Sequence, residues 1–193
     1  MKHPFRRKNL SPRLLPLYLL AAGAFVLAKP TAMGFALGLA WVVGGLALRV
    51  WGAGHLVKND ILTVSGPYAH LRHPLYAGTS MLAIGFAAIA GGAAFVLVVG
   101  CFAPLFFLYY LPYKDRIESA RLERRYGQDY SVYRSEVPAL LPRLSAWVSP
   151  RAPVDARGRS WSRECFRANS EPGTVLGVGF VLALLALRPV LPI

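Results

Sequence analysis

Cysteine and acidic residues are scarce in this chain of 193 residues. The two cysteines, Cys101 and Cys165, provide neither a disulfide framework nor the spacing of a metal site. Nine Asp and Glu stand against 22 Lys and Arg, which gives a net charge of +13. Charged residues make up only 16% of the chain, too few for an ordinary soluble domain.

What the chain has instead is long apolar segments. Hydrophobic residues make up 55% of it, and the mean hydropathy is +0.42. Five blocks are almost free of charge, at residues 14–28, 32–48, 75–90, 93–111 and 173–187. Because a helix needs about 20 apolar residues to cross a bilayer, we predict an all-α, polytopic membrane protein with about five transmembrane helices. The first and last blocks are short, and an interfacial re-entrant helix is the alternative for either.

The basic residues are distributed unevenly along the chain. They gather before the first block, between the second and third, and in a segment from Lys114 to Arg167 that holds twelve of them. Lys29 and Arg188 stand nearly alone on the other side. The positive-inside rule therefore predicts a multi-pass integral membrane protein with a cytoplasmic N-terminus and cytoplasmic polar loops, in contact with anionic lipids. Nucleic-acid binding, the competing interpretation of a pI near 10.4, is disfavoured because the basic residues flank membrane segments.

These patterns divide the chain into four parts. We predict a basic cytoplasmic tail at residues 1–13, a membrane core at 14–143, a basic cytoplasmic linker at 144–172 and a C-terminal membrane helix at 173–193. Within the core, Pro104 predicts a kink and Gly127 the end of a helix over residues 114–126. Arg49 closes the second helix, where we expect its side chain to extend toward the cytoplasm.

Two polar clusters bracket the hairpin of the third and fourth helices. One extends from Lys58 to Tyr76 and the other from Lys114 to Arg143. A helical hairpin returns to the side it left, so both clusters are predicted to meet at the cytoplasmic face. Polar groups beside hydrocarbon must find partners, and their presence there indicates a ligand or a reaction.

Both clusters carry motifs in a fixed order. The first reads Ser65-Gly66-Pro67-Tyr68 and then Arg72-His73-Pro74-Leu75-Tyr76 with Gly78; the second comprises Glu118, Leu122, Tyr126-Gly127, Tyr130, Tyr133, Val137 and Leu141-Pro142-Arg143. With these motifs, residues 32–143 resemble the isoprenylcysteine carboxyl methyltransferase family of integral membrane enzymes. The second motif is also similar to that of membrane phospholipid methyltransferases and, more distantly, membrane sterol reductases.

The resemblance implies methyl transfer from S-adenosylmethionine to a lipophilic acceptor that enters from the bilayer. Carboxylate O-methylation of a lipid or prenylated acceptor is favoured. The alternatives are a phospholipid N-methyltransferase, a nicotinamide-dependent lipid reductase and a non-catalytic lipid-binding protein. No glycine-rich nucleotide loop follows a strand, which disfavours a soluble-type methyltransferase fold.

The resemblance also implies a set of site residues and no metal. The cofactor would be held by Lys58, Asp60, Ile61, Leu62, Thr63, Tyr68, His73, Pro74, Leu75, Tyr76 and Glu118. A carboxylate such as Glu118 can accept hydrogen bonds from an ammonium or from ribose hydroxyls, and tyrosine rings can stack on adenine or face the sulfonium.

The catalytic residues implied are cations and a base. Lys114 stands where the family has a substrate-contacting arginine, and Arg116 is the neighbouring candidate. Either cation would position a carboxylate acceptor, whereas an amine or phenol acceptor would need a base such as His73 or Glu118. One departure from the family pattern is Ser119, which replaces the second of two consecutive acidic residues.

Overall fold

The structure is a computed structural model and describes residues 15–57, 61–148 and 160–190. The described residues form helices and no strand, which confirms the all-α prediction. The principal helices are α1 (Leu15–Val26), α2 (Ala32–His55), α3 (Pro74–Ala90), α4 (Gly92–Ala103), α5 (Leu111–Tyr126), α6 (Gln128–Glu136), α8 (Arg163–Ala168) and α9 (Glu171–Leu187). A π-helical stretch, Pro104–Tyr110, joins α4 to α5 in one continuous helix.

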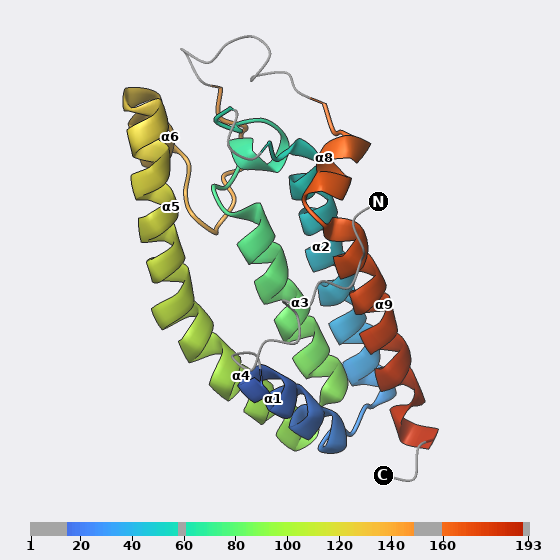
Figure 1. The fold of residues 1–193 in the computed structure, drawn as a ribbon. Coiled ribbons are helices and arrows are strands. Elements are labelled where there is room, and N and C mark those ends of the chain that lie inside the picture. Colours follow the sequence, from blue (N-terminus) through green and yellow to red (C-terminus); the bar gives the residue numbers. More distant parts are fainter. Residues whose placement is uncertain (1–14, 58–60, 149–159, 191–193) are drawn as a thin grey trace.

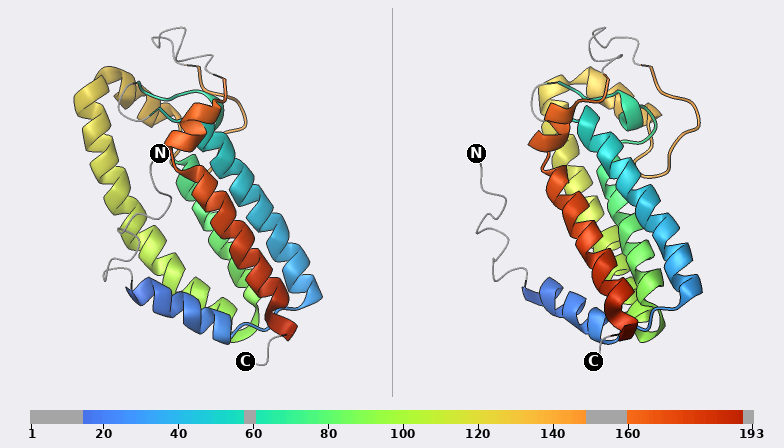
Figure 2. Two further views of the ribbon diagram at one scale, coloured as in Figure 1. Left: turned by 45° about the vertical axis from the view of Figure 1, so that its right-hand side comes forward. Right: turned by 90° about the vertical axis from the view of Figure 1, so that its right-hand side faces the viewer.

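The long helices form a bundle with its loops gathered at one end. Helices α2, α3 and α9 lie side by side, and the α4–α5 helix diverges from α3 toward the end that carries α6 and α8 (Figure 1). Helix α1 lies at the opposite end, where it packs on α4 (Figure 2). The loop between α2 and α3 and the segment after α5 therefore share one end of the bundle.

Among the described residues, three helices are long and apolar enough to cross a membrane: Ala32–His55, Gly92–Tyr126 and Glu171–Val190. Their large apolar side chains are widely exposed, as at Leu37, Val96 and Leu176. A continuous apolar exterior of this kind suits contact with hydrocarbon. Helix α3 is apolar but has 17 residues, and α1 has 12, a length of about 18 Å against about 30 Å of hydrocarbon.

Helices α2 and α3 approach each other through glycines. A Cβ atom at Gly38 would lie 2.5 Å from the carbonyl oxygen of Gly85, and one at Gly45 would lie 2.7 Å from that of Gly78. The two contacts are seven residues apart on each helix, so they recur along one packed seam. Glycines of the second apolar segment therefore allow the two helices to pack closely.

This seam makes a prediction about stability. Gly38→Ala should lower the free energy of unfolding by about 1–3 kcal/mol, because the new methyl group meets backbone that cannot move aside. The matched control is Gly100→Ala on α4, where a Cβ would meet nothing within 4 Å. Thermal unfolding of the detergent-solubilised protein measures both variants. Equal melting temperatures for the two would contradict the packing described.

Several helix boundaries lie where the sequence places them. Pro74 begins α3, where its missing N–H leaves no hydrogen bond unmade. Gly91 and Gly92 turn the chain with φ of 64° and 51°, and Gly127 ends α5 with φ of 52°. At Pro104, where a kink was predicted, the structure has the π-helical stretch, which accommodates the missing N–H of proline in another way.

The prediction that Arg49 ends the second helix is wrong, because α2 continues to His55, and the side chain predicted to extend toward the cytoplasm is largely buried. Its guanidinium group pairs with the carboxylate of Glu171 in the first turn of α9, and both side chains are largely buried. The same guanidinium donates to the Leu75 carbonyl at 3.2 Å and to the Thr79 hydroxyl at 2.7 Å. A buried charge requires a partner of opposite sign, and for Arg49 that partner is Glu171, which is 122 residues away in the sequence.

Candidate functional site

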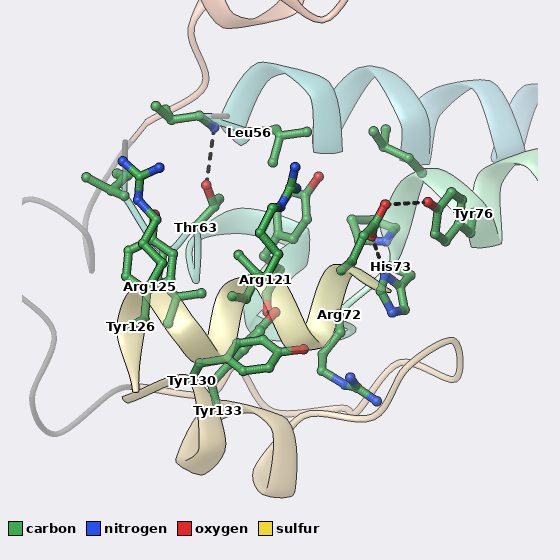
Figure 3. A pocket seen from close by; sticks show the side chains of 18 residues that line it. Leu56, Thr63, Arg72, His73, Tyr76, Arg121, Arg125, Tyr126, Tyr130 and Tyr133 are labelled. Atoms are coloured by element: carbon green, nitrogen blue, oxygen red, sulfur yellow. Dashed lines mark hydrogen bonds and ion pairs between the residues drawn. The ribbon is translucent and has the colours of Figure 1, made fainter. Parts of the chain in front are cut away.

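A cavity of about 440 Å³ lies at the loop end of the bundle, between the loop after α2 and the helices α5 and α6 (Figure 3). Its volume is within the range of small-molecule sites. Both motif clusters contribute to it, as the hairpin argument predicted. The predicted cofactor residues that line it are Ile61, Leu62, Thr63, Tyr68, His73, Pro74, Leu75, Tyr76 and Glu118.

Of the other four predicted residues, Lys58 and Asp60 lie outside the described residues, and Lys114 and Arg116 do not line this cavity. Lys114 places its ammonium group 5.8 Å from the centre of the Tyr110 ring. Arg116 lines a separate hollow of about 360 Å³ on another side of α5. The structure therefore does not bring either predicted substrate-contacting cation to the cavity.

His73 is held between two carboxylates of α5. Its Nε2 atom lies 2.7 Å from Oδ1 of Asp115, and its Nδ1 atom lies 3.9 Å from Oε2 of Glu118. Asp115 also accepts a hydrogen bond from the Arg72 guanidinium at 3.0 Å. A neutral His73 that donates through Nε2 to Asp115 leaves Nδ1 as an acceptor facing Glu118 and the cavity. Sequence reasoning missed Asp115. Its position three residues before Glu118 places both carboxylates on the same side of a helix, which could have indicated its role.

Glu118 and Tyr76 join the two motifs directly. The Tyr76 hydroxyl donates to Oε1 of Glu118 at 2.7 Å. The Tyr76 ring packs on the His73 ring, with centroids 5.2 Å apart, and edge-on against Tyr110 at 6.0 Å. These contacts fix the Glu118 carboxylate at the cavity wall with its second oxygen toward His73, which leaves capacity to accept from a ligand.

Two buried tyrosines form the base of the cavity. The Tyr133 hydroxyl donates to the backbone carbonyl of Tyr68 at 2.8 Å. Burial raises the pKa of both phenols above the usual range, so both stay neutral and able to donate. Tyr133 packs with Val64, Tyr130 and Val137 in a small core that joins the loop to α6. Within the described structure the Tyr68 hydroxyl has no hydrogen-bond partner, and its ring lines the cavity.

The end of the second motif holds the His73 turn in place. The amides of Arg72 and His73 donate to the carbonyls of Pro138 and Ala139 at 2.8 and 3.0 Å. The Arg143 amide donates to the His70 carbonyl, and Nδ1 of His70 lies 2.9 Å from the Arg143 carbonyl. These hydrogen bonds join the backbone of residues 138–143 to the turn that carries His73. The His70 ring takes part in them and does not line the cavity, so its role is structural.

Ser119 faces away from the cavity. Its side chain is buried, and Oγ lies 2.7 Å from the Tyr130 hydroxyl and 3.5 Å from Asp115. Consecutive residues of a helix point in different directions, so Glu118 reaches the cavity and Ser119 does not. The departure from the acidic pair therefore removes no cavity-lining group. It places a hydroxyl where a second carboxylate would have been buried beside Asp115.

The segment after residue 160 supports the far wall of the cavity. The Trp161 indole donates to the Val50 carbonyl at 2.9 Å, and its ring covers Gly54 so closely that a Cβ there would overlap it. The Asn169 amide donates to the carbonyls of Ala53 and Leu56, each at 2.9 Å. These bonds satisfy the last carbonyls of α2, from which Leu56 and Val57 continue into the cavity wall.

Sequence reasoning also missed several polar cavity residues. Arg72, Arg121, Arg125, Tyr126, Tyr130 and Tyr133 all line the cavity. Arg121 and Arg125 are solvent-exposed as well as cavity-lining, and Arg72 and the tyrosines belong to the two motifs without having been given a role in the site. Among the described residues, no group of three or more His, Cys, Asp or Glu side chains is arranged to hold a metal ion.

The described residues form a helical bundle that includes three helices long and apolar enough to cross a membrane and a polar cavity at one end. No protein-family model matches the chain, and no solved structure matches it. The chain is similar to the cobalt-zinc-cadmium resistance protein CzcN of Cupriavidus metallidurans, with 29% identity over 101 residues. The match covers 51% of this chain and 44% of the relative, so it spans less than half of that protein's length.

Proposed function

We propose that this chain is a membrane methyltransferase that uses S-adenosylmethionine and a lipophilic acceptor. The observation that carries the proposal is the meeting of both motif clusters in one cavity, where Tyr76 of the first bonds Glu118 of the second. The proposal includes five membrane segments, of which the first can lie in the interface, and a cytoplasmic cavity. The resemblance to isoprenylcysteine carboxyl methyltransferases supports it independently of the geometry.

The donors and acceptors of the cavity fit this cofactor. Glu118 can accept from its ammonium group or ribose hydroxyls, and the Tyr68 hydroxyl can bond a ring nitrogen or a carboxylate. The faces of Tyr76 and Tyr126 provide surfaces for adenine stacking or for a sulfonium cation. When bound, S-adenosylmethionine supplies a methyl group on a sulfonium, which needs no further activation.

The residues of this chain then have positioning roles. The loop, α5 and α6 enclose the reacting groups, exclude water and hold an acceptor in line. A carboxylate acceptor is already ionised and needs no base. For an amine acceptor, His73 can take the proton at Nδ1, because the Asp115 carboxylate at Nε2 orients the ring and stabilises its cationic form.

The test is incubation of the purified protein with native membranes and S-adenosylmethionine labelled in its methyl group. We expect label in the lipid extract that depends on the protein and is released as methanol by alkali, as for a methyl ester. Label that alkali does not release indicates an N-methylated product. Absence of label with all native lipids, together with saturable binding of a reduced nicotinamide, would replace the proposal with a reductase.

The similarity to CzcN favours a second candidate, a contribution to cobalt, zinc or cadmium tolerance. The two candidates are compatible if tolerance depends on the cavity. Growth of a strain that lacks this chain, complemented with wild type or with Glu118→Ala, compares them in the presence of each metal. Tolerance restored by the wild type alone would place both functions in one cavity, and tolerance restored by both would separate them.

A further inference from the structure

Two arginines of α5 extend into the cavity without a counter-ion in the described part of the chain. Arg121 and Arg125 both line the cavity and are both solvent-exposed, like Arg124 between them. Figure 3 shows their guanidinium groups reaching from α5 toward Leu56 and Thr63. The ion pairs that the structure records are formed by other cations, namely Arg49, Arg72, His73 and Arg134.

The remaining charges of the cavity do not neutralise these two. Arg72 turns its guanidinium group away from the cavity to Asp115, where its charge is compensated. Glu118 is the one carboxylate among the described cavity-lining residues, and it binds Tyr76 and faces His73. The cavity thus has a carboxylate at one end and, one and two helical turns farther along α5, two guanidinium groups that form no ion pair with the described residues; that of Arg125 lies 5.9 Å from the centre of the Tyr126 ring.

The two guanidinium groups carry the same charge on one solvent-exposed face of α5. Like charges four residues apart on a helix repel each other modestly. An anion between them would relieve that repulsion, and guanidinium groups bind carboxylates and phosphates through two parallel hydrogen bonds. The wall beside the arginines is apolar, formed by Leu56, Leu62 and Leu122. The subsite therefore suits an anionic group attached to an apolar body.

We propose that Arg121 and Arg125 form an anion subsite that binds a carboxylate or phosphate group of the ligand. This proposal rests on the proposed function, which assigns the cavity to ligand binding. It adds that the bound ligand carries a negatively charged group. Two molecules can supply the anion: the acidic headgroup of a lipid acceptor, or the carboxylate of S-adenosylmethionine. The guanidinium groups recognise the same chemistry in both cases.

The test measures binding to the detergent-purified full chain by calorimetry with two matched pairs of ligands. One pair is dihexanoyl phosphatidic acid and dihexanoylglycerol, which differ by the phosphate. The other is S-adenosylmethionine and its decarboxylated form. The variants are Arg121→Gln/Arg125→Gln and the control Arg124→Gln, which changes an exposed arginine of the same helix that does not line the cavity.

We expect the wild type to bind the anionic member of at least one pair about tenfold tighter or more. The double variant should lose that preference and Arg124→Gln should keep it, and the pair that shows the effect identifies the source of the anion. No preference in either pair, a preference that survives in the double variant, or an equal loss in Arg124→Gln would overturn the subsite. Preference for the phosphatidic acid without any S-adenosylmethionine binding would support the subsite and contradict the methyltransferase proposal.

Discussion

Glu171→Ala is expected to destabilise the protein by about 3–5 kcal/mol, a fall of roughly 10 °C in melting temperature. The substitution leaves the Arg49 guanidinium buried without its counter-ion, since Glu171 is 3% exposed and Arg49 16%. Arg49 keeps its bonds to Leu75 and Thr79, but neither partner carries a charge. Thermal unfolding in detergent measures the effect.

Two further variants separate the ion pair from a general effect of mutation. Glu164→Ala removes an exposed carboxylate seven residues earlier and should change the melting temperature by little. Arg49→Met/Glu171→Met removes both charges and should recover most of the loss, because the cost comes from the unpaired charge. A double variant as unstable as Glu171→Ala would show that shape, and not charge, holds α9 to the bundle.

The ion pair also assigns a role to helix α9. Arg49 contacts the carbonyl of Leu75, which lines the cavity, while Glu171 begins α9. Helix α9 is thereby linked through one side chain to the beginning of α3. Loss of Glu171 should therefore weaken ligand binding as well as stability, which is testable at a temperature where the variant remains folded.

Glu118→Gln is expected to lower methyl transfer by about 10- to 100-fold, the value of a hydrogen bond to a charged group. The amide oxygen can still accept from Tyr76, so the wall of the cavity should keep its shape. What is lost is the negative charge that attracts a cationic cofactor and faces His73 at 3.9 Å. Initial rates with labelled S-adenosylmethionine measure the change.

Glu123→Gln is the control for Glu118→Gln. It neutralises an exposed carboxylate on the same helix that is not part of the 440 Å³ cavity. Its activity should stay within about twofold of wild type. If both variants lost activity equally, the effect would reflect the net charge of α5 and not the position of Glu118. Unchanged activity in Glu118→Gln would remove this residue from the site.

The juxtaposition of the two motifs was predictable because it depends only on topology. A hairpin that leaves and returns to one side must bring its flanking segments together, and proline and glycine mark its ends at Pro74, Gly91 and Gly127. The same argument specifies which segments meet, but it does not specify how each helix is rotated about its own axis. It could therefore place Glu118 near His73 without showing which cations accompany it.

Lys114 and Arg116 were chosen from the family resemblance, whereas a run of arginines is typical of a solvent-exposed helix face, so Arg121 and Arg125 were not chosen. Glu118, Arg121 and Arg125 recur at intervals of three and four and share the face toward the cavity. The π-helical stretch before α5 shifts the helical phase relative to the membrane segment, and the preceding sequence gives no measure of that shift. The ion pair of Arg49 with Glu171 could not be predicted either, because the sequence around Arg49 does not indicate a partner 122 residues away.

The central claim is that the cavity between the two motifs binds S-adenosylmethionine, and calorimetric titration of the purified protein tests it most directly. We predict saturable binding at one site per chain for the wild type. His73→Ala/Glu118→Ala should abolish that binding, and the exposed control Glu123→Gln should retain it. Absence of binding to the wild type, or undiminished binding to the cavity variant, would contradict the account.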